Sequence, residues 1–317
     1  MSRMVKGILI FVSLFWAGPL AAQNSLTLYS VKGPSGVALI RLFEEPPRFP
    51  GTEIKLEALA QADLIAARFI SGEAKLGILP ANVAAKIASG GRRIRAAAVI
   101  GSGMLSLLSA DPGVRRIEDL RGKTVEVAGQ GATPDYVFRR ILLARGLNPG
   151  GDLRLSYALA YPEIAQSLMA GRILNALLPE PFATMALAGN PGIRRVGDMQ
   201  AEWIAAGGVG NYPMTVLAVD ADLAESNPGL VRAVLEACRS SVAWVISHPA
   251  EAGALTEKYR IGLSAGIVSA AVPRSAYGFI PAVEAKPALE ALFGAFLEYA
   301  PASIGGVLPP DSFYLSW

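Results

Sequence analysis

Residues 124–136 read Thr124-Val-Glu-Val-Ala-Gly-Gln-Gly-Ala-Thr-Pro-Asp-Tyr136, and they predict a strand, a glycine turn and the start of a helix. The two valines alternate with polar or small residues, a period of two that is typical of a β-strand. The two glycines permit a sharp turn, and Thr133 followed by Pro134 predicts the beginning of a helix with Thr133 as its N-cap. Unpaired N–H groups at such a helix start favour an electron-rich ligand atom. A capped helix that binds nothing would have the same sequence.

Strand-to-helix steps of this kind recur along the chain, and they predict an α/β protein with mainly parallel sheets. The predicted strands are 25–31, 53–58, 76–79, 95–100, 104–110, 124–128, 153–158, 174–178, 193–196 and 214–220. The predicted helices are 37–43, 62–70, 82–88, 134–145, 162–170 and a segment ending near 188. From Pro228 onward the chain is predicted to be mostly helical.

An internal near-repeat predicts two similar lobes. Residues 70–84 align with residues 169–183, a shift of 99 (169 minus 70), and each stretch has a helix stopped by glycine, an apolar strand and Leu-Pro. Residues 33–35 likewise align with residues 131–133. Chance similarity in an Ala/Leu-rich chain is the alternative, but the matched order of elements supports a repeat. Ligands of open α/β sheets gather at the carboxyl ends of strands. We therefore expect the loops that begin at Lys32, Leu79, Ala128 and Leu178 to face one small molecule.

The first residues read as a secretory signal peptide covering residues 1–22. Arg3 and Lys6 precede an apolar run, and Ala21-Ala22 offers small residues for cleavage. A retained N-terminal anchor is the alternative, although the run is short for a membrane span. We therefore expect an exported, soluble protein in the periplasm.

Charge and the rare reactive residues exclude several function classes. The chain has 29 basic and 26 acidic side chains, and loss of Arg3 and Lys6 would leave 27 against 26, a net charge of +1. This balance argues against nucleic acid or an anionic membrane as the partner. Cys238 is the single cysteine and His248 the single histidine, so we expect neither a disulfide nor a zinc site, and we predict no metal and no cofactor.

The whole chain resembles the periplasmic solute-binding proteins of ABC importers, in the branch similar to the sulfonate, nitrate, taurine and thiamine-precursor binders (SsuA/THI5-like and NMT1-like). The residues that carry the resemblance are 32–36 (Lys-Gly-Pro-Ser-Gly), 79–83 (Leu-Pro-Ala-Asn-Val), 129–136, 178–182 (Leu-Pro-Glu-Pro-Phe) and 304–314. Each piece alone is a weak signal, but their combination in this order is specific.

The resemblance implies a two-lobed type II periplasmic binding protein, a "Venus flytrap" whose chain crosses between the lobes twice. We place these crossings near residues 109–112 and 211–214. Lobe 1 would then hold residues 23–110 and 213–317, and lobe 2 residues 111–212. The implied function is capture of a small organic molecule between the lobes and its delivery to the permease and ATPase of an importer. We expect a monomer that catalyses no reaction.

The candidate ligand-binding residues lie in the strand-to-helix loops and near the second crossing. They are Lys32, Gly33, Pro34, Ser35, Pro80, Asn82, Gly131, Ala132, Thr133, Tyr161, Glu180, Asn211 and Tyr212. Backbone N–H groups at Ser35 and Thr133 would suit a sulfonate. Glu180 would repel an anion and accept bonds from an amino group, so a thiamine-precursor-like heterocycle is preferred narrowly over a sulfonate. The structural alternative for Glu180 is a helix-start acid.

Two other functions stay open. Proteins similar in fold act as enzymes in pyrimidine and menaquinone-precursor biosynthesis, although this chain offers no Ser/His/Asp or Cys/His nucleophile set. A sensory module that reports ligand occupancy to a membrane kinase could have the same binding site. An export signal argues against the biosynthetic enzyme.

Overall fold

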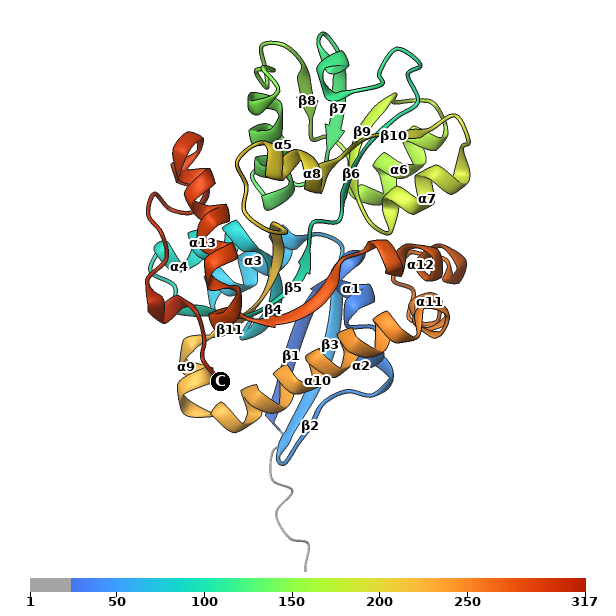
Figure 1. Ribbon diagram of the computed structural model, residues 1–317. Coiled ribbons are helices and arrows are strands. Elements are labelled where there is room, and N and C mark those ends of the chain that lie inside the picture. Colours follow the sequence, from blue (N-terminus) through green and yellow to red (C-terminus); the bar gives the residue numbers. More distant parts are fainter. Residues whose placement is uncertain (1–23) are drawn as a thin grey trace, which may run out of the picture.

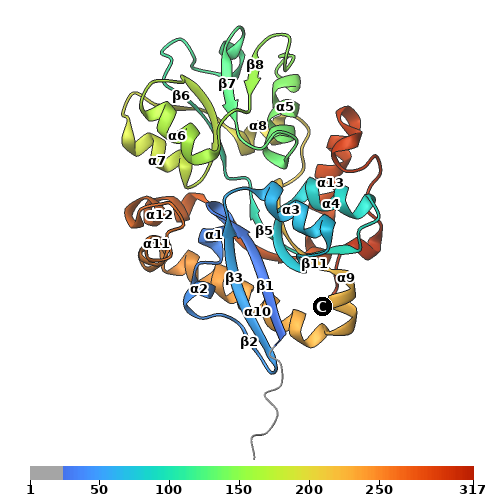
Figure 2. The ribbon, with the colours of Figure 1, turned by 180° about the vertical axis from the view of Figure 1, so that it is seen from behind.

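The chain forms two α/β lobes, one above the other in Figure 1, in a computed structural model that describes residues 24–317. The predicted signal peptide lies outside these residues. The upper lobe contains β6 to β10 with α5 to α8, and the lower lobe is built from both ends of the described chain. Figure 2 shows the same division from behind. Within residues 24–317, no helix is both long enough and apolar enough to cross a bilayer.

The strands fall close to the segments that the alternating apolar residues predict. They are β1 (Asn24–Val31), β2 (Arg48–Phe49), β3 (Thr52–Leu59), β4 (Leu76–Pro80), β5 (Ile94–Ser102), β6 (Leu105–Ser109), β7 (Thr124–Val127), β8 (Arg154–Ser156), β9 (Asn175–Pro179), β10 (Arg194–Asp198), β11 (Pro213–Asp220) and β12 (Tyr277–Pro281). Strand β12 lies in the C-terminal region that was predicted to be mostly helical. Its sequence, Tyr-Gly-Phe-Ile-Pro, has the aromatic and branched residues that favour a strand.

Eight of the thirteen helices described here have glycine, proline or a small polar residue as their N-cap, as capping chemistry favours. The thirteen helices are α1 (Pro34–Ala38), α2 (Arg41–Glu44), α3 (Ala62–Ser71), α4 (Ala81–Ser89), α5 (Thr133–Ala144), α6 (Tyr161–Met169), α7 (Phe182–Gly189), α8 (Met199–Ala205), α9 (Ala221–Ser226), α10 (Pro228–Ser247), α11 (Pro249–Lys258), α12 (Ala265–Ala271) and α13 (Ala282–Tyr299). Short 3-10 turns cover Ile117–Leu120, Val272–Arg274, Pro301–Ser303 and Asp311–Phe313.

The two sheets share one topology, which confirms the two lobes that the near-repeat predicts. The first sheet has the order β12-β5-β11-β4-β1-β3-β2, and the second has the order β10-β6-β9-β7-β8. In the first, β1 pairs in parallel with β3 and β4, and in the second β7 pairs in parallel with β8 and β9. Beyond these parallel pairs, each sheet continues through two antiparallel pairs. They are β4 with β11 and β11 with β5 in the first sheet, and β9 with β6 and β6 with β10 in the second.

The sheets are mixed, and the prediction of mainly parallel sheets is wrong. Strands β11, β12 and β2 add antiparallel pairs to the first sheet, and β6 and β10 add them to the second. The first strand after each crossing, β6 in the second sheet and β11 in the first, runs antiparallel to its neighbours in the sheet that it joins. Nothing in their apolar pattern distinguishes the two directions, because both place alternate residues on opposite faces.

The first crossing between the lobes lies earlier than residues 109–112. Strand β6 pairs with β9 in the second sheet, so the chain leaves the first sheet at Gly103 and Met104. The second crossing lies between α8 and β11. On this topology we propose residues 24–102 and 213–317 as lobe 1, and residues 105–205 as lobe 2.

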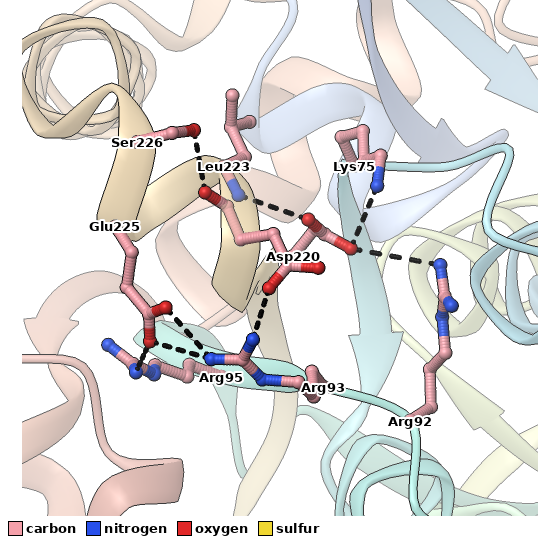
Figure 3. Close-up of polar contacts among 9 residues, drawn as sticks. Lys75, Arg92, Arg93, Arg95, Asp220, Leu223, Glu225 and Ser226 are labelled. Atoms are coloured by element: carbon pink, nitrogen blue, oxygen red, sulfur yellow. Dashed lines mark hydrogen bonds and ion pairs between the residues drawn. The ribbon is translucent and has the colours of Figure 1, made fainter.

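A cluster of ion pairs ties β11 to its neighbours at the end of the first sheet that is remote from the other lobe. Asp220 is only 2% exposed, and its carboxylate lies 3.0 Å from the Lys75 ammonium and 3.7 Å from the Arg92 guanidinium. It also accepts a hydrogen bond from the Leu223 N–H and so caps α9. Figure 3 shows these contacts, which compensate the buried charge.

Candidate functional site

A cavity of about 500 Å³ lies between the two lobes. Its walls come from the carboxyl ends of strands in both sheets, where the loops into the following helices diverge. Lobe 1 contributes residues 31, 32, 34, 35, 60–63 and 78–80, and lobe 2 contributes residues 128–130, 132, 134, 157–163 and Pro179. Met104, Met214 and Thr215 complete the lining near the two crossings. The symmetric arrangement follows from the shared topology, because equivalent strand ends of two like sheets face each other.

Four helices of nine or more residues begin at this cavity. They are α3, α4, α5 and α6, and the residues at their starts (Ala62, Pro80, Ala132 and Tyr161) line it. Each helix start carries a partial positive charge because its first N–H groups lack partners within the helix. Two carboxylates, Asp63 and Glu163, stand in the first turns of α3 and α6 and also border the cavity. The site therefore offers both donors and acceptors to a polar ligand.

The glycine turn before α5 forms one wall of the cavity. Gly129 and Gly131 have φ angles of 72° and 77°, which L side chains rarely adopt. The Asp135 carboxylate accepts a 2.9 Å hydrogen bond from the Gly131 N–H and so holds the turn in place. Neither the Gly129 nor the Gln130 N–H has an acceptor within residues 24–317. These two donors are thus free for a bound molecule.

A polar cluster behind this wall fixes Tyr157, which lines the cavity. The Tyr157 hydroxyl donates to Asp135 at 2.7 Å and accepts from Arg139 at 2.6 Å. Burial, reinforced by the hydrogen bond to Asp135, raises the pKa of Tyr157 well above its usual value. The phenol consequently stays neutral at physiological pH.

On the opposite wall, Lys32 is the basic side chain in the lining. It is exposed, and within the described residues it forms no ion pair. Ser35 lies beside it, but its hydroxyl accepts a 3.0 Å hydrogen bond from the Val31 N–H and serves the local turn. Lys32 is therefore the charged group best placed to meet an anion.

Tyr161 forms an aromatic wall of the cavity. Its ring stacks on Phe182, with centroids 5.7 Å apart and an interplanar angle of 20°. Phe182 in turn touches Gly33 of the other lobe, where an added Cβ would lie 3.0 Å from the ring. Gly33 is buried under this contact, so it permits the lobes to approach and is not part of the lining.

Asn82 and Thr133 face each other across the boundary between the lobes. The Thr133 hydroxyl donates to the Asn82 side-chain oxygen at 3.0 Å, and the Asn82 amide donates to the Gly131 carbonyl at 2.8 Å. Both side chains are fully buried, and neither lines the cavity. The N-cap of α5 is Ala132, so the prediction that Thr133 caps the helix is wrong. The hydroxyl joins the lobes instead.

Glu180 is neutralised inside lobe 2. It is 1% exposed, and its carboxylate lies 2.6 Å from the Arg195 guanidinium. Its other oxygen accepts a 2.9 Å hydrogen bond from the Thr184 N–H in the first turn of α7. The carboxylate thus acts as the helix-start acid that was the structural alternative, and it does not line the cavity. Glu180 therefore does not repel an anion in the cavity.

Asn211 and Tyr212 belong to the second crossing. The Tyr212 carbonyl accepts a 3.0 Å hydrogen bond from the Gly103 N–H, which joins the two crossings, and its ring packs on Trp203. Asn211 is exposed and stands against Gly103. Neither residue lines the cavity.

The structure brings six of the thirteen candidates to the cavity: Lys32, Pro34, Ser35, Pro80, Ala132 and Tyr161. Gly131 adjoins it through the glycine turn but lines a different hollow. Sequence reasoning missed Gln61, Asp63, Met104, Gln130, Tyr157 and Met214, which also line the cavity. Asp63 and Gln130 stand in strand-to-helix steps and were within reach of that reasoning. Met104 and Met214 were not within reach of that reasoning, because their positions depend on where the chain crosses between the lobes.

The described residues hold no cluster of three or more His, Cys, Asp or Glu side chains suited to a metal ion. Cys238 is buried in the core of lobe 1, and burial raises its pKa to about 12. His248 is exposed and stacks on Trp244. Neither residue reaches the cavity lining.

Comparison with known proteins identifies related sequences and folds. The model of the NMT1-like family matches residues 45–257. The chain is similar to the crystal structure of an ABC transporter from Parabacteroides distasonis, with 24% identity over 92% of this chain and 99% of that one and a TM-score of 0.75. A search of curated proteins found no match.

Two sulfonate-binding proteins are also similar in structure. One is the periplasmic aliphatic sulphonate binding protein SsuA from Escherichia coli, with 19% identity over 87% of each chain and a TM-score of 0.69. The other is the alkanesulfonate-binding protein SsuA from Xanthomonas axonopodis pv. citri bound to MOPS, with 17% identity over 92% of this chain and 96% of that one and a TM-score of 0.71. These likenesses confirm the predicted two-lobed fold of the type II periplasmic binding proteins.

Proposed function

The chain belongs to the NMT1-like family, and on that premise we propose that it is the solute-binding protein of an ABC importer. It captures a small organic molecule between its lobes and delivers it to a membrane permease with its ATPase. The observation that carries this proposal is the interlobe cavity of about 500 Å³ onto which strand ends and helix starts of both lobes converge. A ligand held there contacts both lobes, so it favours their closed arrangement.

The ligand that fits this cavity best is a small organic anion. Lys32 and the free N–H groups of Gly129 and Gln130 supply positive potential and donors from opposite lobes. Tyr161 and the methionine side chains supply an apolar surface for the rest of the molecule. Asp63 and Glu163 add acceptors at the border, which favour an anion that also carries an amino or hydroxyl group. An aminoalkyl sulfonate combines these features.

Binding without chemistry is favoured over an enzyme. The acids at the cavity stand at helix starts, and the Glu163 carboxylate accepts the Ala160 N–H at 2.9 Å. The described lining lacks a nucleophile paired with a base, because Cys238 and His248 both lie elsewhere. The family also includes THI5-like enzymes, so turnover of each bound ligand should be measured directly.

Thermal unfolding in the presence of candidate ligands tests the proposal. A panel should contain an alkyl sulfonate, an aminoalkyl sulfonate, an alkyl carboxylate and a hydroxymethylpyrimidine. A ligand present at about 100 times its Kd adds roughly 2.7 kcal/mol to the free energy of unfolding. In a chain of this size that raises Tm by about 5 °C. We expect the aminoalkyl sulfonate to give the largest shift.

Lys32→Gln should weaken anion binding, and Lys55→Gln should not, since Lys55 lies on β3 outside the cavity lining. A hydroxymethylpyrimidine that stabilises the protein while both sulfonates do not would return the ligand to the thiamine-precursor class. Failure of the whole panel, with no ligand found by native mass spectrometry of protein purified without refolding, would contradict a solute-binding function.

Whether the protein serves import or sensing depends on the membrane protein with which it acts. Neighbouring genes for a permease and an ATPase would support import, whereas a neighbouring membrane kinase would support a sensor. Signal-peptide cleavage and export to the periplasm are part of the proposal, and N-terminal sequencing of periplasmic protein tests both. A monomer is expected and is checked by light scattering.

A further inference from the structure

A second cavity, of about 650 Å³, lies on another side of the interlobe boundary. Lobe 1 supplies α3, α4 and the turn at residues 90–92, and lobe 2 supplies residues 130–131 and Tyr136. Ser303, from the turn after α13, completes the lining. This hollow therefore touches both lobes and the C-terminal segment.

The polar groups of the second cavity are mainly cationic. Lys86 is exposed, and within residues 24–317 its ammonium forms no ion pair. Arg92 donates to the Phe69 carbonyl at 2.9 Å, and its guanidinium approaches Asp220 only to 3.7 Å. The N–H groups of the guanidinium that these contacts do not use remain donors for another acceptor.

A buried hydroxyl in the lining lacks a partner. Ser303 is 2% exposed, and its Oγ atom has no hydrogen-bond partner among the described residues. A buried hydroxyl without a partner costs free energy, which a bound acceptor or donor would recover. Around these polar groups the walls are apolar and include Ile70, which is 63% exposed, and Val83. Cationic groups, a free hydroxyl and apolar walls together suit an anion with an alkyl body.

We propose that this second cavity binds an amphipathic monoanion, with its carboxylate at Lys86 and Ser303 and its alkyl chain along Ile70 and Val83. The same molecule would contact Gly131, whose carbonyl accepts from Asn82 at 2.8 Å, and Ser303, whose carbonyl accepts from Asn82 at 3.3 Å. Its occupancy therefore stabilises the contact between the lobes. Gln130 lines both cavities, which makes it the residue through which they meet.

A coupling between the cavities follows, and this part rests on the proposed function. A monoanion that binds the closed lobes raises the affinity of the principal cavity for its solute, and the solute raises the affinity for the monoanion by the same factor. Binding of the monoanion itself does not depend on the identity of that solute. The two proposals can therefore fail separately.

Calorimetric titration of the full mature protein with octanoate tests the site. Octanol, octylammonium and acetate serve as probes that lack the charge, reverse it or lack the alkyl chain. We expect saturable binding of octanoate and much weaker binding of all three controls. Lys86→Gln should weaken octanoate binding by about fivefold, the size expected for one partly exposed charge-assisted contact. Ala66→Phe should weaken it further by filling the hollow.

The variants also locate the bound octanoate. Lys32→Gln, in the principal cavity, should leave octanoate binding unchanged, as should Lys55→Gln, because Lys55 lines neither cavity. Absence of saturable octanoate binding would overturn the proposal. So would binding that Lys32→Gln weakens and that Lys86→Gln and Ala66→Phe leave unchanged, because the octanoate would then lie in the principal cavity. If Ala66→Phe does not fold, weaker octanoate binding in Lys86→Gln with unchanged binding in Lys32→Gln supports the proposal.

Discussion

The hydroxyl of Thr133 donates a hydrogen bond of 3.0 Å to the side-chain oxygen of Asn82, and both side chains are buried where the two lobes meet. Thr133 begins α5 in lobe 2, and Asn82 lies in the first turn of α4 in lobe 1. The same asparagine donates to the carbonyls of Gly131 and Ser303. One side chain thus links both lobes and the C-terminal segment.

Thr133→Val should lower stability more than ligand affinity. The substitution keeps the shape but leaves the buried Asn82 oxygen without its donor, which costs about 1–3 kcal/mol. Urea unfolding measures this loss, with Thr124→Val on the exposed face of β7 as the matched control. If ligand affinity falls further than in Lys32→Gln while stability is unchanged, Thr133 contacts the ligand as the sequence predicted.

Glu180→Gln should destabilise lobe 2 and leave ligand affinity unchanged. The substitution removes a charge that is paired with Arg195 and that caps α7. Because the Arg195 side chain is 37% exposed and can be hydrated, we expect a loss of about 1–3 kcal/mol, less than for a fully buried pair.

Arg195→Met should cost more than Glu180→Gln, because it leaves the buried carboxylate without a counterion and with only the hydrogen bond from the Thr184 N–H. Denaturant unfolding and ligand titration of both variants measure the two effects. A large loss of affinity in Glu180→Gln with normal stability would contradict the assignment of Glu180 to the structure of lobe 2.

Gly103→Ala should disturb the first crossing. Gly103 has a φ of 43°, and an added Cβ would lie 1.7 Å from the Asn211 side-chain oxygen. We expect a loss of about 1–3 kcal/mol from strain and displacement together. The double variant Gly103→Ala, Asn211→Ala should recover the part due to the clash with Asn211 and keep the parts due to φ and to the Gln200 oxygen, 2.6 Å from the added Cβ. Equal stability of the single and double variants would show that Asn211 moves aside freely.

Acidification should destabilise the protein in part through Asp111. Its hydrogen bond with Lys123, reinforced by the Gly113 N–H, lowers the pKa of Asp111 from its ordinary value of 3.8. A carboxyl with a lowered pKa in the folded state stabilises the protein above its unfolded pKa. That contribution is lost as pH falls from about 4 through the lower folded pKa.

Asp111→Asn should reduce the slope of stability against pH below about pH 4, measured by urea unfolding in steps of pH. Lys123→Met should have a similar effect, because it removes the largest cause of the lowered pKa. An unchanged slope in both variants would assign the acid sensitivity to other carboxylates.

Much of the fold follows from local sequence. The alternating valines before Gly129, the proline after Thr133 and the glycines that stop helices place most strands and helices within a few residues of the observed ones. These signals are local because capping and backbone conformation depend on neighbouring residues. The near-repeat at a shift of 99 residues even predicted two similar lobes, since equivalent positions in each lobe need the same turn chemistry.

The sheet that each strand joins was decided only by the tertiary structure. Strands β5 and β6 follow each other closely, and yet they belong to different sheets. The same limit applies to the site. Lys32 and Tyr161 line the cavity, whereas Glu180 turns to Arg195 and Thr133 to Asn82. Thr133 and Asn82 are 51 residues apart in the sequence. Local sequence signals predict where polar and flexible residues gather at strand ends. Their choice between a ligand and each other depended on long-range packing, because a buried polar group bonds to whichever partner the folded lobes bring within reach.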